Sequence, residues 1–484
     1  METQTKKATN SQKLGLISLI AIVISTMIGS GIDGLPQNMA ANSALGPIVI
    51  AWIICGIGMY CIARTFMILS DARPDLNAGI YMYAREGFGP FIAFNVAWGY
   101  WLMNIFSNVA FAIITMDTLN YFFPGYFTGG NNITSIIGAS ILIWSVNFMV
   151  LSGTKSTGRI NTIGTFAKMI PLFTFIIIII YALNYTKFAS NIWGQVQTPT
   201  QPNLGSISAQ IMSPLTVALW CFIGIEGAVA LSGRARNKKD VGKATFIGFI
   251  ISLSLCMLVS VLPFGILSQD QLKSIPTPST AGVLKIITGD WGEWLINFGV
   301  LISVITSWLA WTMICGEIPM VAAQNSTFPK IFARRNKNGA ASVALWVSAI
   351  LMQFVILCVY FASHAWIMML NIASITVIPA YIASNAYLLK LCITGEYTQY
   401  AKRGRYVALI TSIIGIFFCL LMFYATKLEY VVFVPITLMI GFPLYVLAKK
   451  QNQPGKPILN KNEIIYFIFL FLLTVIALAV MFIW

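Results

Sequence analysis

Two short glycine-containing interruptions hold the residues of this chain that are best suited to contact a charged solute. Residues 29–31 (Gly-Ser-Gly) interrupt the first long apolar segment, and residues 224–227 (Gly-Ile-Glu-Gly) interrupt the sixth. Glycine within a membrane helix frees backbone N–H and C=O groups, which hydrocarbon tolerates only where they line a cavity. Two interrupted helices at matching positions of two halves indicate a midplane transport site. We therefore expect a small charged solute to bind here.

Acidic side chains within apolar segments form a second group of candidates. A charge in hydrocarbon costs several kcal/mol, so each such residue is a functional hypothesis. Glu226 lies inside the second interruption and is expected to exchange protons or to pair with a cationic substrate, the alternative being an ion pair with a neighbouring helix. Asp33 lies two residues after the first interruption, where it could cap a half-helix or contact substrate. Asp117 and Glu317 lie nearer segment ends and are expected to be structural or to line a vestibule.

One basic residue, Lys168, lies about two turns inside the fifth apolar segment. Its long stem could carry the ammonium to the cytoplasmic surface. Alternatively, the ammonium could point inward and donate hydrogen bonds that hold the two broken helices in place, and we favour this second interpretation. The sole histidine, His364, cannot form a metal site alone, and the eight cysteines show no metal-like pairing. No metal or cofactor is expected.

Aromatic and amide side chains near the middle of the segments could complete a site for a cation. Tyr100 lies in the middle of the third segment, with Asn108 two turns later. Trp220 precedes the second interruption, and Trp308 and Trp311 lie within the eighth segment. An aromatic face over a cation contributes about 0.5–2 kcal/mol and can also block its exit. Core packing or an interfacial position is the alternative for each ring.

The whole chain has the composition of an integral membrane protein. Of its 484 residues, 58% are hydrophobic and 9% are charged. Thirteen apolar segments recur, each near the roughly 20 residues that cross a bilayer. They cover about residues 14–40, 45–70, 90–122, 133–151, 162–184, 211–232, 243–267, 292–323, 341–363, 365–393, 404–425, 428–449 and 463–483. The first is too long for a signal peptide and lacks a small-residue cleavage pattern.

The distribution of positive charge predicts the orientation. If the N-terminus is cytoplasmic, only four of the 30 Lys and Arg residues face outward, and these are Lys187, Lys273, Lys285 and Lys427. This asymmetry follows the positive-inside rule. The net charge of +15 is thus explained by topology, without a nucleic-acid partner. No soluble domain or GxxxxGK[ST] pattern is visible, so a secondary carrier or a channel is expected rather than an ATP-driven pump.

An ordered set of motifs resembles the basic amino acid/polyamine antiporters of the amino acid–polyamine–organocation superfamily, and among them the arginine/ornithine exchangers look closest. The resemblance runs from about residue 14 to about residue 450. It rests on the Gly-Ser-Gly break, LPQNMA at 35–40, AGIYMYAREGFGP at 78–90, WGYW at 98–101, WCFIGIE at 220–226, LSGRARNKKDVGKA at 231–244 and FPKIFAR at 328–334.

The resemblance implies an all-α membrane fold of two inverted five-helix repeats, helices 1–5 and 6–10, with broken helices 1 and 6. Residues 1–13 would form a cytoplasmic tail, 14–393 the transport core and 394–484 two or three accessory helices. In the arginine/agmatine exchangers of this family, the backbone matching Ser30 and Gly31 holds the substrate carboxylate, and the tryptophan matching Trp220 stacks on the guanidinium.

Further roles come from the same resemblance. The asparagine matching Asn108 contacts substrate. The residues matching Tyr100, Glu226 and Trp311 act as gates. Lys168 resembles the lysine that proton-coupled members place where sodium-coupled members bind their ion. Two features depart from the family pattern: a thirteenth helix is predicted here, and Asp33 occupies a position that is usually apolar or aromatic. We include Trp311 and Asp33 among the substrate-binding residues, Asp33 because it favours a guest with an additional positive charge.

Together these observations predict a transporter, not an enzyme, that exchanges cationic amino acids by alternating access, with arginine/ornithine antiport as the first choice. The alternatives are exchange of an amino acid for its decarboxylation product (arginine/agmatine, lysine/cadaverine or histidine/histamine), one-way proton-coupled uptake, and a channel or non-transporting sensor. Amino acids or amines and membrane lipids are the expected partners, and a homodimer is left open. The expected location is the bacterial inner membrane, with many passes and a cytoplasmic N-terminus.

Overall fold

The computed structural model describes residues 13–29, 31–196, 203–362, 365–401 and 404–483. Within this part of the chain, all regular elements are helices, and the only β-type pairing is an isolated bridge between Leu14 and Ala235. Thirteen helices are long and apolar enough to cross a membrane. The predicted all-α membrane fold is therefore confirmed, and these thirteen helices correspond to the thirteen apolar segments of the sequence.

The helices either form the spans or lie in the connections between them. Those that form the spans are α2 (Leu16–Met27) with α3 (Leu35–Ala40), α4 (Leu45–Ala72), α6 (Pro90–Phe122), α7 (Ile133–Leu151), α8 (Thr154–Ala182), α10 (Ile207–Phe222) with α11 (Gly227–Ala230), α12 (Lys239–Val261), α15 (Asp290–Gln324), α16 (Ser342–Val359), α17 (Ala365–Thr394), α19 (Arg405–Ala425), α21 (Phe433–Ile440) with α22 (Phe442–Asn452), and α23 (Lys461–Ile483). Three of these spans also include a shorter piece: η1 (Ile32–Gly34) in the first, η4 (Leu262–Gly265) in the seventh and α20 (Leu428–Val431) in the twelfth. The connections contain α5 (Gly79–Phe88), α9 (Tyr185–Ala189), α13 (Gln269–Ser274), α14 (Ser279–Thr288), α18 (Tyr397–Tyr400) and the 3₁₀ turns η2 (Thr128–Gly130), η3 (Ser232–Arg234) and η5 (Lys330–Ala333).

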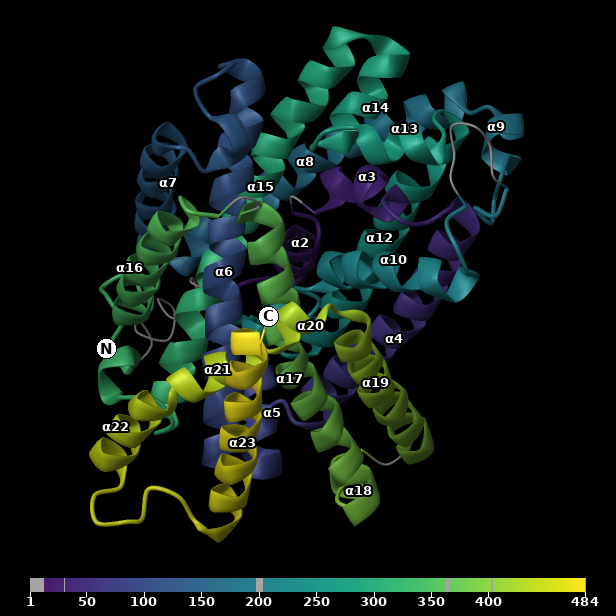
Figure 1. Ribbon diagram of the computed structural model, residues 1–484. Helices are drawn as coiled ribbons and strands as arrows, with labels where there is room; N and C mark the ends of the chain where they lie inside the picture. The colour runs from purple at the N-terminus through teal and green to yellow at the C-terminus, as the bar shows by residue number, and fades with distance from the viewer. Residues whose placement is uncertain (1–12, 30, 197–202, 363–364, 402–403, 484) are drawn as a thin grey trace.

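The bundle has two ends, which we name after the short helices that lie there. Figure 1 shows α5, α18 and the turn between α22 and α23 at one end, and α9, α13 and α14 at the other. The α5 end also holds the start of α2, because Leu14 pairs with the segment that follows α11. The two interrupted spans, α2–α3 and α10–α11, cross the middle of the bundle between these ends (Figure 1).

The centre of the bundle is built around the long helices α6, α15 and α17. Helix α6 packs against both α15 and α17, whereas α2 packs against α8 and α12. These central helices bury most of their apolar side chains, while α7, α16 and α23 expose theirs on outward faces, as helices in contact with lipid do. The division into a ten-helix core and an accessory segment stays a prediction.

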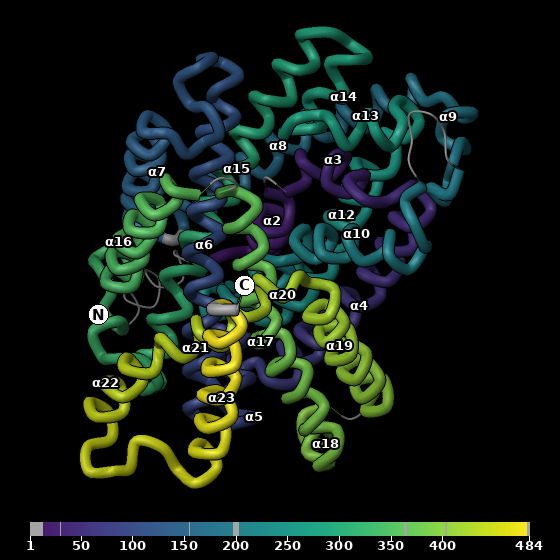
Figure 2. The backbone as a smooth tube through the Cα atoms, viewed as in Figure 1, coloured from purple at the N-terminus to yellow at the C-terminus, as the bar shows by residue number. Residues whose placement is uncertain are grey.

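The thirteenth span, α23, is attached to the core through a buried acid, Glu463. Its carboxylate accepts hydrogen bonds from the backbone N–H groups of Phe91 at 3.2 Å and Asn460 at 2.8 Å. Phe91 lies in the first turn of α6, where N–H groups lack partners within the helix. Figure 2 shows α23 running beside α21 in the C-terminal part of the bundle.

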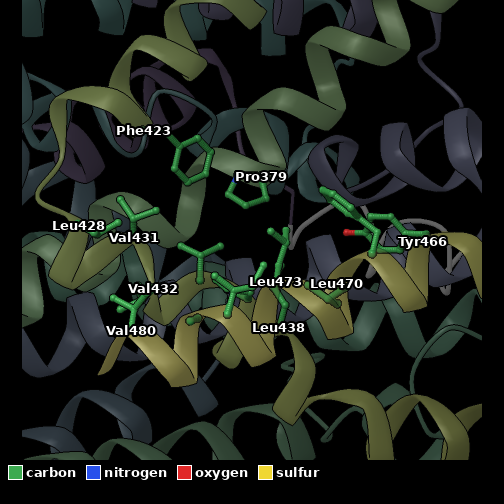
Figure 3. A pocket seen from close by; sticks show the side chains of 15 residues that line it. Pro379, Phe423, Leu428, Val431, Val432, Leu438, Tyr466, Leu470, Leu473 and Val480 are labelled. Carbon is green, nitrogen blue, oxygen red and sulfur yellow. The ribbon is translucent and has the colours of Figure 1, made fainter. Parts of the chain in front are cut away.

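An apolar cavity of about 380 Å³ lies between α23 and the helices α17, α19, α20 and α21. Figure 3 shows Pro379, Leu438, Leu470 and Tyr466 among the side chains that surround it. All lining residues except Tyr466 are without a polar side-chain atom. Apart from the Tyr466 hydroxyl, the cavity therefore offers no polar side-chain contact to a charged solute, and it is not a candidate for the transport site.

Candidate functional site

The first interruption lies directly against the Trp220 ring. Gly31 has helical backbone angles, φ −64° and ψ −34°, so conformation alone does not require glycine. However, a Cβ atom on Gly31 would lie 2.2 Å from the indole nitrogen of Trp220 and 2.5 Å from its Cδ1 atom. Gly31 is therefore needed for close approach of the ring to the backbone. Ser30, predicted to bind substrate with Gly31, lies outside the described residues.

The second interruption is shaped by Gly224, whose φ of +107° is one that side-chain-bearing residues rarely adopt. A Cβ atom there would also lie 2.6 Å from Cβ of Thr26. Thr26, in the last turn of α2, donates its hydroxyl to the Gly224 carbonyl at 2.8 Å. The two interrupted helices thus touch each other at their breaks, as expected for a site made from freed backbone groups.

Glu226 accepts hydrogen bonds from two tyrosines on two different helices. The hydroxyl of Tyr100, on α6, donates to Oε1 at 2.6 Å, and that of Tyr381, on α17, donates to Oε2 at 2.6 Å. The Gly224 N–H also reaches Oε2 at 3.3 Å. All three side chains are fully buried. This cluster connects the break in α10–α11 to α6 and α17, two of the three central helices, and the hydrogen bonds to its carboxylate come from polar groups rather than a cation.

Lys168, on α8, points inward and is 1% exposed. Its ammonium donates hydrogen bonds to groups on α2, the first break and α15. The acceptors are the Ile28 carbonyl, the Ser25 carbonyl at 3.4 Å, the Ser25 hydroxyl at 3.3 Å and the Ser307 hydroxyl at 3.1 Å. A carbonyl left free at the end of α2 thereby gains a charged donor. The ammonium does not reach a surface, so this geometry matches the bracing interpretation.

Helix α15 contacts the first interrupted span through Trp311 and α6 through Thr312. The indole N–H of Trp311 donates to the Thr26 carbonyl at 3.1 Å. The hydroxyl of Thr312 donates to Oδ1 of Asn108, on α6, at 3.4 Å, and the Asn108 amide donates to the Asn104 carbonyl at 2.8 Å. Trp311 therefore packs on the end of α2, while Asn108 lies in the contact between α6 and α15.

The hydrogen bonds of Asp33 connect it to α14. It follows the first break in η1, and its Oδ1 accepts a hydrogen bond from the Thr280 hydroxyl at 3.1 Å. Its own carbonyl accepts from Ser279 at 3.2 Å and from Thr280 at 3.3 Å. Ser279 and Thr280 are the first two residues of α14. These bonds therefore hold the second half of the first broken helix against α14. A role of Asp33 in substrate binding stays a prediction.

A cavity of about 80 Å³ lies beside Gly31 and Trp220. It extends toward Trp366 and Asn371 on α17, and toward Asn38 on α3. Because Trp366 is the second residue of α17, which begins at the α14 end, the cavity lies on that side of the Trp220 ring. It has room for several water molecules, but a bound amino acid would require it to widen.

Between Glu226 and the α5 end, the bundle is closed by polar contacts between segments that are distant in the sequence. Arg234 forms a salt bridge to Glu317 at 3.0 Å and donates to the Gly339 carbonyl at 3.1 Å. The backbone of Leu14 pairs with that of Arg234 and Arg236 at 2.8 Å each. Glu317, expected to be structural or to line a vestibule, is thus one half of a closing contact. The transport site is thus closed toward the α5 end, and the cavity beside Trp220 lies toward the α14 end.

Sequence reasoning missed several residues of this site. Tyr381 and Thr26 gave no signal, because a tyrosine or threonine in an apolar span is common and its partner depends on packing. Asn104, one turn from Tyr100, keeps a buried Oδ1 without a partner within the described residues, and so offers a free acceptor.

Within the same part of the chain, no group of three His, Cys, Asp or Glu side chains could hold a metal ion.

Comparison with known proteins shows which transporters this chain is similar to. The model of the amino acid permease family matches residues 14–445. The chain is 49% identical over 473 residues to an arginine/agmatine antiporter of Chlamydia pneumoniae, covering 98% of both chains. It is 48% identical over 468 residues to the arginine/agmatine antiporter of Chlamydia caviae, covering 97% of this chain and 96% of that one. It is also 48% identical over 474 residues to the arginine/agmatine antiporter of Chlamydia trachomatis serovar D, covering 98% and 96%.

Proposed function

This chain belongs to the amino acid permease family, and from that premise we propose that it exchanges arginine for agmatine across the membrane by alternating access. The general prediction of an amino acid antiporter, a transporter and not an enzyme, is confirmed by the family and its named relatives. The finer assignment of the substrate pair rests on the arrangement of Trp220, Gly31 and Glu226.

The single observation that carries the proposal is the packing of the Trp220 ring on the glycine backbone of the first break. Backbone N–H groups freed there can bind a carboxylate, as helix N-termini do. A guanidinium is planar and weakly hydrated, so it stacks well on an indole face. A solute that spans both features carries a carboxylate at one end and a guanidinium at the other, which describes arginine.

The same geometry favours agmatine over ornithine as the exchanged solute. Agmatine keeps the guanidinium of arginine and lacks the carboxylate, so it retains the stacking contact with Trp220. Ornithine carries an ammonium in place of the guanidinium and would lose the planar stack. The relatives named above are arginine/agmatine antiporters, which supports this choice among the alternatives. Arginine/ornithine antiport, our first choice from sequence, becomes the competing hypothesis.

The conformation supports a cycle in which the two ends open in turn. The contacts of Tyr100 and Tyr381 with Glu226, together with the Arg234–Glu317 salt bridge, close the α5 end. The small cavity lies toward the α14 end. Opening the α5 end requires these contacts to break, and bound substrate would lower the cost by replacing some of them. We assign the α5 end to the cytoplasm from its excess of basic residues, in a bacterial inner membrane.

Glu226→Gln is expected to flatten the pH dependence of exchange, because glutamine keeps an acceptor for one tyrosine but cannot gain or lose a proton. The loss of one charge-assisted hydrogen bond should also lower the exchange rate by about tenfold. The measurement is arginine exchange in liposomes across a series of pH values. Asp117→Asn removes another acid from a span and serves as the control. An unchanged pH profile in Glu226→Gln would assign the titration to another group.

Asp33→Asn is expected to shift the ratio of arginine to agmatine affinity by roughly fivefold in favour of arginine. A buried carboxylate near the first break repels the carboxylate of arginine and attracts the doubly charged agmatine, and the difference is on the order of 1–2 kcal/mol for charges roughly 10–15 Å apart at an effective dielectric constant near 20. Asparagine can still accept the Thr280 hydroxyl, so the contact with α14 is kept. Competition binding of both solutes measures the ratio. Equal changes for the two solutes would limit Asp33 to a structural role.

Uptake into loaded liposomes tests the proposed exchange. Purified protein is reconstituted, and uptake of labelled arginine is compared among liposomes that contain agmatine, ornithine, lysine or no amine. We expect rapid uptake with internal agmatine and little with none. Equal uptake into empty liposomes would identify a one-way permease, and uptake with ornithine but not agmatine would favour the competing pair. Conduction at channel rates without counterflow would reject a carrier.

A further inference from the structure

A polar cavity of about 390 Å³ lies at the α5 end, apart from the site around Trp220. Four parts of the chain form its wall: α5, the start of α6, the turn after α15, and α22. Its polar lining side chains include Arg85, Glu86, Asn325, Tyr445, Lys449 and Gln453. None of these residues takes part in the proposed transport site. The volume lies within the range of roughly 300–1,000 Å³ that is usual for small-ligand sites.

The charges that line this cavity are not balanced within it. Arg85 donates from Nη1 to the neutral Oδ1 atom of Asn325 at 2.9 Å, so no carboxylate compensates its charge there. Glu86, the one carboxylate in the lining, interacts at 3.7 Å with Arg73, which is not among the lining residues. Two cations therefore face a cavity whose only acid is shared with a third cation.

Lys449 is the second cation and comes from a different helix, α22. It lies in the last turn of α22, where a positive charge suits the helix dipole. It is half-buried, and within the described residues its ammonium has no hydrogen bond or ion pair. A partly desolvated ammonium without an acceptor, in the same cavity as an arginine whose hydrogen bond goes to an amide, favours binding of an anion.

We propose that this cavity binds a phosphate group, held between Arg85 and Lys449. A guanidinium can donate two parallel hydrogen bonds to phosphate oxygens, and an ammonium adds a point charge. Gln453, also in the lining, supplies a further amide donor. The group can belong to the head of an anionic phospholipid or to a soluble phosphate ester, because basic pockets between membrane helices on the cytoplasmic side suit both. The proposal does not depend on which amines are transported.

Such a ligand would stabilise the closed arrangement of the α5 end. The cavity wall joins α5 to the turn after α15, and these elements also meet through the Tyr81 hydroxyl and the Thr327 hydroxyl at 2.6 Å. A ligand that contacts both elements binds only while they stay together, so it shifts the equilibrium toward this conformation. Burial of the Tyr81 phenol raises its pKa to about 12, so this contact stays neutral at ordinary pH.

Thermal unfolding in a neutral detergent tests the proposal. The unfolding midpoint is measured with short-chain phosphatidylglycerol, with short-chain phosphatidylcholine and with inorganic phosphate, at constant ionic strength. We expect phosphatidylglycerol, inorganic phosphate or both to raise the midpoint by several degrees over the zwitterionic lipid. A rise with the lipid alone identifies a headgroup as the source, and a rise with phosphate identifies a soluble anion. No rise with either would overturn the proposal.

The variants Lys449→Gln and Lys450→Gln separate the cavity from general charge effects. Lys450 is the next residue of α22, is exposed and does not line the cavity. Lys449→Gln should raise the dissociation constant for the stabilising anion by about tenfold, as loss of one charge-assisted contact implies. Lys450→Gln should leave it unchanged, and Lys449→Arg should retain binding. Equal losses in Lys449→Gln and Lys450→Gln would contradict the proposed site. Native mass spectrometry after release from lipid nanodiscs provides a second count of bound anionic lipid.

Discussion

Replacing Trp220 by leucine is expected to weaken binding of arginine and agmatine by about tenfold or more, while binding of a small neutral amino acid changes little. The ring lies directly on Gly31, so its loss removes both the wall behind the solute and the face on which a guanidinium stacks. The stacking term alone is about 0.5–2 kcal/mol, and the larger value corresponds to roughly 30-fold in affinity. Equilibrium binding of labelled arginine to purified protein measures this effect.

The control for this experiment is Trp346→Leu, which removes an indole that is 40% exposed on α16. It should leave arginine affinity at the wild-type value. If Trp220→Leu reduced affinity for arginine and for alanine to the same extent, the ring would act as a general wall and not as a cation-stacking surface. That outcome would remove the main structural argument for a guanidinium-bearing substrate.

Lys168→Ala is expected to reduce the exchange rate at least tenfold and to lower the unfolding temperature. The ammonium is the charged donor for the last carbonyls of α2, and it also links α8 to Ser307 on α15. Removal of a buried charged donor costs about 1.5–3 kcal/mol for each hydrogen bond that is lost and not replaced. The rate of arginine exchange in liposomes and the unfolding temperature of the same preparations measure the two effects.

Arg159→Ala is the matched control, because Arg159 is an exposed cation on the same helix. It should retain exchange and stability. Wild-type exchange in Lys168→Ala would mean that the broken helix keeps its geometry without the lysine. Loss of exchange with unchanged stability would instead indicate a role in the transport cycle, such as a proton-linked step.

The breaks themselves could be predicted from the sequence because their cause is local. The glycines within residues 29–31 and 224–227 weaken the helix whatever the fold of the rest of the chain. Glu226 and Lys168 could also be selected, since a charged residue in an apolar span is rare enough to require an explanation. Both lie at the breaks in the structure, within hydrogen-bond distance of the interrupted segments or their neighbours.

The partners of these residues could not be predicted, because they come from helices far away in the sequence. Tyr381 reaches Glu226 across 155 positions, and Thr280 reaches Asp33 across 247 positions. Nothing in a single sequence distinguishes Tyr381 from the other tyrosines of the spans. Glu463 was missed for a different reason: it lies at the predicted edge of the last span, where an acid attracts no attention, yet it is buried against α6.

The most direct test of the proposed exchange is the effect of membrane potential on it. At neutral pH arginine carries one net positive charge and agmatine carries two, so each exchange of external arginine for internal agmatine moves one positive charge outward. In liposomes loaded with agmatine, a potassium diffusion potential that is negative inside should slow arginine uptake, and one that is positive inside should accelerate it. Arginine-for-arginine exchange in the same liposomes should not respond. Uptake that is independent of potential, or accelerated by a negative interior, would contradict arginine/agmatine antiport.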